Sequence, residues 1–209
     1  MNRFCVIIAL LAFNFATAER ALAESGSALT MPQKGAVWLS GIEFLSGYSR
    51  GNNIRRKDDI QEIPLMLDID LDLKPLLKKI NFGPPVLTQF QIEPFISTIY
   101  EPVKEDSNKN NIESGVAFWF KFGLFPESWK LQPYVKFGAG LDYMTLHTLN
   151  ESTQFNFISQ LALGMHYFFL KNTALTLEGR YRHLSNAGIK EPNRGINSYF
   201  ILGGIAYRY

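Results

Sequence analysis

The chain has 209 residues, of which 46% are hydrophobic, and it carries 21 basic and 19 acidic residues. This nearly balanced charge and the lack of a basic stripe argue against a nucleic-acid partner. Beyond the first residues, no segment has the roughly 20 consecutive apolar residues that a transmembrane helix needs. The length suits a single domain of ordinary size or one complete small barrel.

The N-terminus has the pattern of a secretory signal peptide. Arg3 supplies a positive charge, and about a dozen mostly apolar residues follow it, which is the length of a signal core rather than of a membrane span. Small-residue motifs place the cleavage after Ala18 or after Ala23. We therefore expect residues 1–23 to be a signal peptide and 24–209 to form a single exported domain.

Neither disulfides nor metal sites are expected in the exported domain. The only cysteine, Cys5, lies inside the expected signal peptide, so the stability of the mature chain must come from its fold. The three histidines, His147, His166 and His183, lie on different segments without the spacing of metal ligands. We expect the protein to use no metal and no cofactor.

Eight segments of alternating polarity follow the signal peptide, each with the period of a strand that has one apolar face. In chain order they are 36–48, 62–74, 87–100, 114–124, 131–146, 155–169, 175–185 and 196–209. An even number of strands, each a weak signal by itself, is typical of bacterial outer-membrane barrels. The sequence therefore predicts an all-β fold, an eight-stranded antiparallel transmembrane β-barrel of outer-membrane type.

The alternation also predicts which face of each strand points inward. In 62–74, leucines and isoleucine alternate with aspartates, and three carboxylates on one face cannot lie in hydrocarbon. Because side chains fill the lumen of an eight-stranded barrel, we expect paired charges inside rather than a pore. The expected interior acids are Asp68, Asp70, Asp72, Glu93 and Glu178, and the expected interior bases are Lys121, Lys136, Arg180, Arg182 and Arg208.

A soluble calycin-like barrel or sandwich is the alternative fold, with the apolar faces turned inward. It would place the charged faces in solvent and bury aromatic residues near the strand ends, such as Trp38, Tyr134, Tyr143, Tyr167 and Tyr207. Amphipathic rings at strand ends suit the interface belts of a membrane barrel better. The membrane barrel is therefore the preferred interpretation.

The segment 175–185 carries the candidate chemistry. His183 and Ser185 lie two residues apart on its apolar face, with Cα atoms about 6.6 Å apart, which suits a serine nucleophile and a histidine base. With both ends of the mature chain in the periplasm, this pair falls near the external end of the strand, on the side that faces lipid. The connections expected outside the cell are 49–61, 101–111, 147–152 and 187–195.

The stretch 178–199, EGRYRHLSNAGIKEPNRGINSY, resembles the motif of the lipid A 3-O-deacylase (PagL) family. Elsewhere only the signal peptide and the eight-strand pattern agree with the family. The resemblance implies an outer-membrane esterase that removes the 3-O-linked acyl chain of lipid A, the anchor of lipopolysaccharide, in the external leaflet. It also implies a Ser-His-Glu triad on the outer surface of the barrel.

The resemblance assigns roles to individual residues. Ser185 would be the nucleophile and His183 the base, while Asn186 and the backbone N–H groups of Ala187 and Gly188 would hold the oxyanion. Asn193 would support the loop that follows the strand.

One position departs from the family's motif, because Asn197 stands where the family has its glutamate. An amide oxygen can accept a hydrogen bond from the imidazole and fix its tautomer, but it cannot stabilise imidazolium by charge. Glu191 is the nearest spare carboxylate in the loop. A non-enzymatic structural or adhesion barrel that keeps the motif without the acid is therefore the alternative function. A homodimer is compatible with either.

Overall fold

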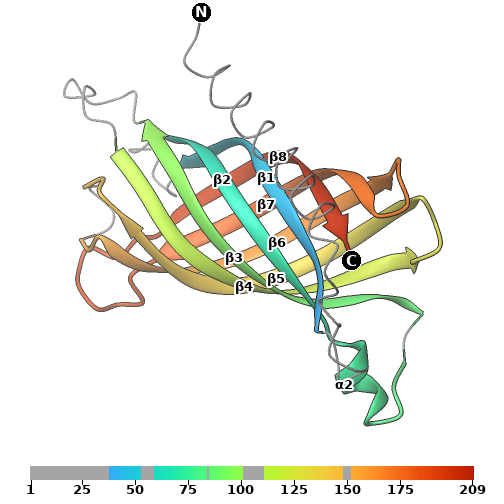
Figure 1. Ribbon diagram of the computed structural model, residues 1–209. Coiled ribbons are helices and arrows are strands. Elements are labelled where there is room, and N and C mark those ends of the chain that lie inside the picture. The colour runs from blue at the N-terminus through green and yellow to red at the C-terminus, as the bar shows by residue number, and fades with distance from the viewer. Residues whose placement is uncertain (1–37, 53–58, 84, 101–110, 148–151) are drawn as a thin grey trace, which may run out of the picture. The chain divides into compact units, whose positions relative to one another are not determined.

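The computed structural model describes residues 38–52, 59–83, 85–100, 111–147 and 152–209 (Figure 1). The expected signal peptide and both cleavage positions lie outside the described residues. In the described part of the chain, no helix has the length and hydrophobicity required to cross a membrane.

Eight antiparallel strands close into a barrel, in which consecutive strands pair and β8 pairs with β1 (Figure 1). The strands are β1 (Leu39–Asn52), β2 (Asp59–Asp72), β3 (Val86–Tyr100), β4 (Asn111–Pro126), β5 (Leu131–Met144), β6 (Phe155–Phe168), β7 (Thr173–Ser185) and β8 (Ile196–Arg208). The predicted eight-stranded antiparallel barrel is confirmed, with strand ends that differ from the prediction by a few residues.

The connection between β2 and β3 contains a short helix, α2 (Lys74–Lys78), which was not predicted. Pro75 lies in its first turn, where the fixed φ of proline suits a helix. The Lys74 N–H donates to Asp72 Oδ1 at 2.9 Å, and the Lys74 ammonium pairs with Glu127 in the connection between β4 and β5. Asp72 therefore lies at the rim, where it supports the start of α2, and not among the interior ion pairs.

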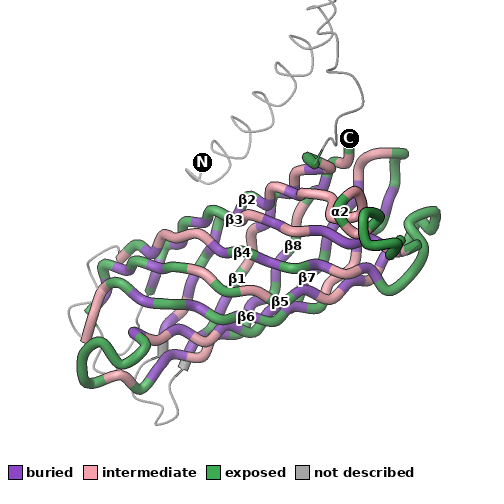
Figure 2. Tube along the Cα trace, turned by 90° about the horizontal axis from the view of Figure 1, so that it is seen from below, coloured by how far each residue is buried: buried purple, intermediate pink, exposed green. Residues whose placement is uncertain are grey.

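Exposure alternates along the strands in the sense that the membrane barrel requires (Figure 2). On β2, Leu65 and Leu67 are 42% and 41% exposed, whereas Asp68 and Asp70 are 0% and 2% exposed. The apolar faces thus form an outer wall and the charged faces fill the interior. This orientation is the reverse of the soluble calycin-like alternative, which is wrong for this chain.

The interior is held by a dense network of ion pairs. Arg180 forms a two-pronged pair with Glu93, with both N···O distances at 2.7 Å, and it also lies 2.8 Å from Glu178. Lys136 Nζ lies 2.9 Å from Glu178 and 3.1 Å from Asp68. Because each charge in this group has a partner of opposite sign at hydrogen-bonding distance, the desolvation cost of burying them is largely offset.

Further interior partners were missed in the sequence. Arg182 pairs with Glu62 and Glu113 at 2.8 and 2.9 Å, and Lys121 pairs with Glu43 at 3.0 Å. Glu62 lies on the same face of β2 as Asp68 and Asp70, so the alternation that placed those aspartates inside was also the available signal for it. Tyr134, expected in an interface belt, is also inside, where its hydroxyl donates to Glu178 at 2.8 Å. The predicted interior base Arg208 is half-buried near the end of β8.

The two ends of the barrel differ. One end carries the C-terminus, α2 and the short connections 127–130 and 169–172, whereas the opposite end carries the connection 186–195 (Figure 1). Because β7 runs toward the second end, His183 and Ser185 lie next to the connection 186–195.

Candidate active site

The predicted catalytic pair lies on the outer wall. Along β7, Leu175 and Leu177 are exposed and Arg180 and Arg182 are buried, so that odd-numbered residues point outward. His183 and Ser185 continue the outward series, each partly covered by its neighbours. Both side chains therefore project on the face that carries the apolar wall, away from the charged interior.

Asn197 faces His183 directly across the β7–β8 pair. The two residues are register partners, and Asn197 Oδ1 lies 2.7 Å from His183 Nδ1. Because an amide oxygen only accepts hydrogen bonds, this contact requires the histidine proton to be on Nδ1. Nε2 then keeps its lone pair and can act as a general base.

Tyr181 joins the pair of His183 and Asn197, and it was not predicted to be part of the site. Its hydroxyl donates to Asn197 Oδ1 at 2.9 Å, so the amide oxygen accepts from both Tyr181 and His183. The Tyr181 ring packs against Tyr199, with ring centroids 5.3 Å apart. Tyr181 lies two residues before His183, so both side chains point to the same face of the strand, and this spacing could have predicted its place in the site.

Gly195 forms part of the floor beneath the imidazole. Its φ is +71°, and a Cβ built on it would lie 2.5 Å from His183 Cε1 and 3.1 Å from Nε2. Any side chain at this position would displace the His183 ring, and the left-handed backbone independently favours glycine. Gly195 therefore allows the ring to approach the backbone at the start of β8.

Ser185 is the last residue of β7 and lies across from Phe157 on β6. Within the described part of the chain, no hydrogen bond joins Ser185 Oγ to His183. Catalytic hydrogen bonds in free enzymes are often long and shorten only when substrate binds. The structure thus places the two side chains on one face of one strand, without a formed contact.

The loop after Ser185 is built around Asn186, which is fully buried. The Asn186 backbone N–H donates to Asn193 Oδ1 at 3.1 Å, and its side-chain amide donates to the Lys190 carbonyl at 2.7 Å. Asn186 Oδ1 accepts from the Gly188 N–H at 3.0 Å. The Asn186 side chain and the Gly188 N–H are thus engaged within the loop.

Ala187 and Gly188 are the central residues of a tight turn. Their φ angles are +55° and +79°, and the Ile189 N–H closes the turn on the Asn186 carbonyl at 3.1 Å. Positive φ at both central positions is the pattern of a type I′ turn. Among the described residues, the Ala187 N–H has no hydrogen-bond partner.

Two further contacts fix the loop. Ser152, from the connection between β5 and β6, donates through Oγ to the Lys190 carbonyl at 2.8 Å. Glu191 Oε2 accepts from the Asn193 N–H at 3.1 Å, so this exposed carboxylate serves its own loop. No described contact joins Glu191 to His183, and Glu178 is buried on the opposite side of the sheet.

A groove of about 950 Å³ leads away from the site along the outer wall. Its floor follows one row of register partners, from Ser159 on β6 to Ala139 on β5 and Phe118 on β4. His183, the register partner of Ser159 on β7, lies next to this row but does not line the groove. Small side chains at Ser159 and Ala139 leave the depression. Larger outward side chains rise on both sides of the floor, namely Phe137, Leu141, Phe157, Leu161 and Tyr181.

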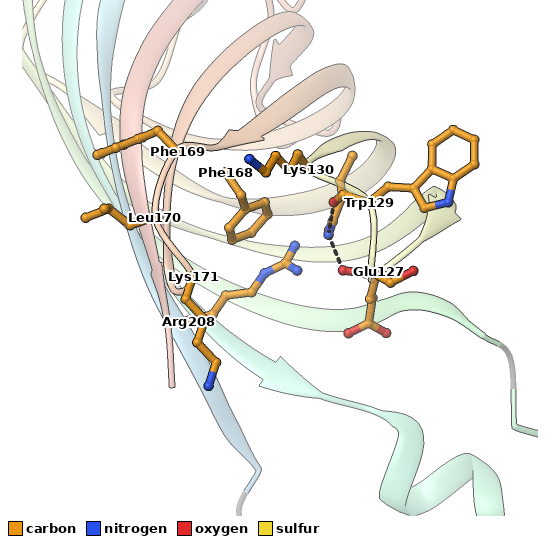
Figure 3. Close-up of a pocket in the computed structure, with 10 residues that line it drawn as sticks. Glu127, Trp129, Lys130, Phe168, Phe169, Leu170, Lys171 and Arg208 are labelled. Atoms are coloured by element: carbon orange, nitrogen blue, oxygen red, sulfur yellow. Dashed lines mark hydrogen bonds between the residues drawn. The ribbon is translucent and has the colours of Figure 1, made fainter.

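A second pocket, of about 500 Å³, lies at the opposite end of the barrel. Figure 3 shows Arg208 reaching toward Phe168 within it, and the guanidinium lies 4.5 Å from the centre of that ring. Lys130 and Lys171 line the same pocket. It shares no residue with the His183 cluster.

The described residues contain no group of three or more His, Cys, Asp or Glu side chains able to hold a metal ion. His166 and His183 lie on opposite sides of the barrel wall, since His166 is buried in the interior and His183 faces outward. On the outward face, Tyr181 and Ser185 supply hydroxyls, His183 an imidazole and Asn197 an amide.

Comparison with known proteins points to one family. The family model described as lipid A 3-O-deacylase (PagL) matches residues 87–206, a range that includes Tyr181, His183, Ser185 and Asn197. No curated protein matches the sequence.

Two solved outer-membrane barrels are similar in fold. The crystal structure of the outer membrane enzyme PagL is 17% identical, covers 78% of this chain and 97% of its own, and has a TM-score of 0.54. The crystal structure of Neisserial surface protein A (NspA) is 8% identical, covers 81% of this chain and 97% of its own, and has a TM-score of 0.56. At these identities the likeness extends to the barrel architecture alone.

Proposed function

The chain belongs to the lipid A 3-O-deacylase (PagL) family, and on this premise we propose that it is an outer-membrane esterase that hydrolyses the 3-O-linked acyl chain of lipid A. The observation that carries the proposal is that His183, in hydrogen-bond contact with Asn197, lies on the same outward face of β7 as Ser185. A base with a fixed tautomer beside a serine, mounted on an apolar wall, suits an ester embedded in a lipid leaflet.

The proposed reaction is acyl transfer to water. His183 Nε2 takes the proton of the Ser185 hydroxyl as Oγ attacks the ester carbonyl, and the carbonyl π electrons move onto the oxygen. The tetrahedral intermediate collapses, the sugar oxygen leaves with the proton from His183, and an acyl-serine remains. Water, deprotonated by His183, then releases the fatty acid and restores Ser185.

The oxyanion needs hydrogen-bond donors close to Ser185. We assign this role to the Ala187 N–H, with Asn186 holding the turn that presents it. The Gly188 N–H could join only by giving up its bond to Asn186 Oδ1. Asn193 supports the same turn through the Asn186 N–H.

Asn197 takes the position of the family's glutamate with a neutral group. Its oxygen holds the proton of His183 on Nδ1, which is the orienting part of the acid's role. It adds no negative charge to stabilise the imidazolium that forms during the reaction. We therefore expect an enzyme that is active but slower than one with a carboxylate at this position.

The groove from Ser159 to Phe118 is proposed to hold the acyl chain that is removed. Its floor crosses two strand spacings, or about 10 Å, so an extended acyl chain can lie along it. Its walls are aromatic and aliphatic, and its inner end lies beside the candidate base. The ester at the end of such a chain would then meet Ser185.

We place the protein in the bacterial outer membrane, with the apolar wall in the bilayer and the cluster facing the external leaflet. The exposed leucines of the wall and the buried charges of the interior support the membrane location. Ser185 lies at the end opposite the two four-residue turns, 127–130 and 169–172, and short turns on the periplasmic side support an external position for it. Lipid A, the membrane anchor of lipopolysaccharide, is the ester-bearing lipid of that leaflet.

Mass spectrometry of lipid A from expressing cells tests the proposal. Cells with the wild type should lose the 3-O-linked chain, and cells with Ser185→Ala should keep it. Ser46→Ala, which removes an outward hydroxyl from β1 far along the wall, should behave as the wild type. If wild type and Ser185→Ala both leave the chain in place, the esterase proposal fails and a non-enzymatic barrel is the better description.

A further inference from the structure

We propose that Tyr181 is a positioning residue, which holds the amide of Asn197 with its oxygen, and not its nitrogen, facing His183. The inference rests on the proposed function for its catalytic meaning, but the contact itself lies in the structure. Asn197 Oδ1 accepts from the Tyr181 hydroxyl at 2.9 Å and lies 2.7 Å from His183 Nδ1.

The need for such a residue follows from the chemistry of an amide. A carboxylate presents an oxygen whichever way it is rotated, whereas the two ends of an asparagine side chain differ. If Asn197 turned by 180°, its NH₂ would donate to His183 Nδ1. The histidine proton would then move to Nε2, and the imidazole could no longer accept the proton of Ser185.

Tyr181 disfavours that rotation because its own proton needs an acceptor. The hydroxyl projects along the apolar outer wall, where an unpaired donor is costly. The acceptor that the structure supplies is Asn197 Oδ1. Turning the amide would bring its NH₂ to the hydroxyl and leave the phenolic proton without this partner.

The position of Tyr181 makes this contact specific. It lies two residues before His183 on the same face of β7, so its hydroxyl reaches diagonally across to Asn197 on β8. Packing of its ring against Tyr199, at 5.3 Å, restricts where the hydroxyl can go. Tyr199 is the register partner of Tyr181, and no described hydrogen bond joins its hydroxyl to Asn197.

The tautomer of His183 gives a readout that does not depend on activity. We would record nitrogen NMR spectra of the histidine-labelled barrel in detergent, with His183→Gln to assign the signal among the three histidines. The wild type and Tyr199→Phe should show the proton on Nδ1. Tyr181→Phe should shift His183 toward the form with the proton on Nε2.

Ester hydrolysis gives the second readout. Tyr181→Phe should lower kcat by a factor of about five to ten, the effect of one lost hydrogen bond, with little change in KM. In the Asn197→Glu background, the same replacement should change kcat by less than about twofold, because a carboxylate has no wrong end. A purely structural role of Tyr181 would give the same loss in both backgrounds.

The outcomes distinguish the positioning role of Tyr181 from the proposed esterase activity. If Tyr181→Phe leaves the His183 signal as in the wild type, or costs equal activity in both backgrounds, the positioning role is overturned while the esterase stands. If the wild type hydrolyses no lipid ester, yet Tyr181→Phe shifts the tautomer, the positioning role is supported and the proposed function fails. Retention of the folded, heat-modifiable band would show that each variant still forms the barrel.

Discussion

Asn197 lies directly across the β7–β8 pair from His183, with its Oδ1 2.7 Å from the Nδ1 of the imidazole. Fourteen residues separate the two in the chain, and the strand register brings them together. The neutral amide reproduces the geometry of an acid–base pair without its charge. Orientation and electrostatic stabilisation, which a carboxylate supplies together, are therefore separated in this protein.

Substitution of Asn197 should resolve these two contributions. Asn197→Ala removes both the oriented acceptor and the tautomer preference, and kcat/KM for a lipid ester should fall by a factor of about ten or more. Asn197→Glu adds the charge that stabilises imidazolium, and kcat should rise above that of the wild type. Equal rates for the wild type and Asn197→Ala would show that His183 is oriented by something else.

The close approach of Gly195 to His183 predicts a local loss of function. In Gly195→Ala, the new methyl group would lie 2.5 Å from His183 Cε1, so the ring must move, and the positive φ adds strain of about 1 kcal/mol. We expect a large fall in kcat with the barrel still folded. Gly203→Ala, on the outer wall with its nearest neighbour at 3.9 Å, is the matched control and should keep full activity.

The acyl groove predicts a change in chain-length preference. Ala139→Phe would fill the floor between Ser159 and Phe118, so the ratio of kcat/KM for dodecanoyl over butanoyl esters should fall at least about tenfold. Gly203→Phe adds the same ring to the outer wall on β8 and should leave the ratio unchanged. A fall in the ratio for both variants would mean that the groove has no special part.

The interior ion pairs predict the stability of the barrel. Arg180→Met leaves the carboxylates of Glu93 and Glu178 short of a partner in the interior, and the free energy of unfolding should fall by about 3–5 kcal/mol. Urea titration of the barrel folded into lipid vesicles measures this. Lys171→Met, in the exposed connection between β6 and β7, should change it by less than about 0.5 kcal/mol.

The proposed orientation in the membrane can be tested with single cysteines. The only natural cysteine, Cys5, lies in the expected signal peptide, so the wild type should give no background. In intact cells, a membrane-impermeant maleimide should label Lys190→Cys, in the loop after β7. Lys171→Cys, at the other end of the barrel, should react only after the cells are broken. Labelling in the reverse pattern would turn the site toward the periplasm.

The sequence alone determined the class of fold and the side on which the pair lies. The alternation of leucine with aspartate in β2 left one stable arrangement, with the aspartates inside and the leucines outside. The structure confirms it for Asp68 and Asp70, while Asp72 lies at the rim. The same period of two placed His183 and Ser185 on one outward face. These inferences depend only on the alternation of polar and apolar residues along one strand, which is visible in the sequence.

The tertiary structure decided what depends on partners far apart in the chain. The register of β7 against β8 places the Tyr181 hydroxyl against Asn197. Because β8 begins at Ile196, this register also places the backbone of Gly195 against the His183 ring. Burial of the Asn186 amide in its own loop likewise arose from contacts with Ser152 and Lys190. Strand pairing and side-chain reach set such contacts, and neither leaves a periodic signal in the sequence.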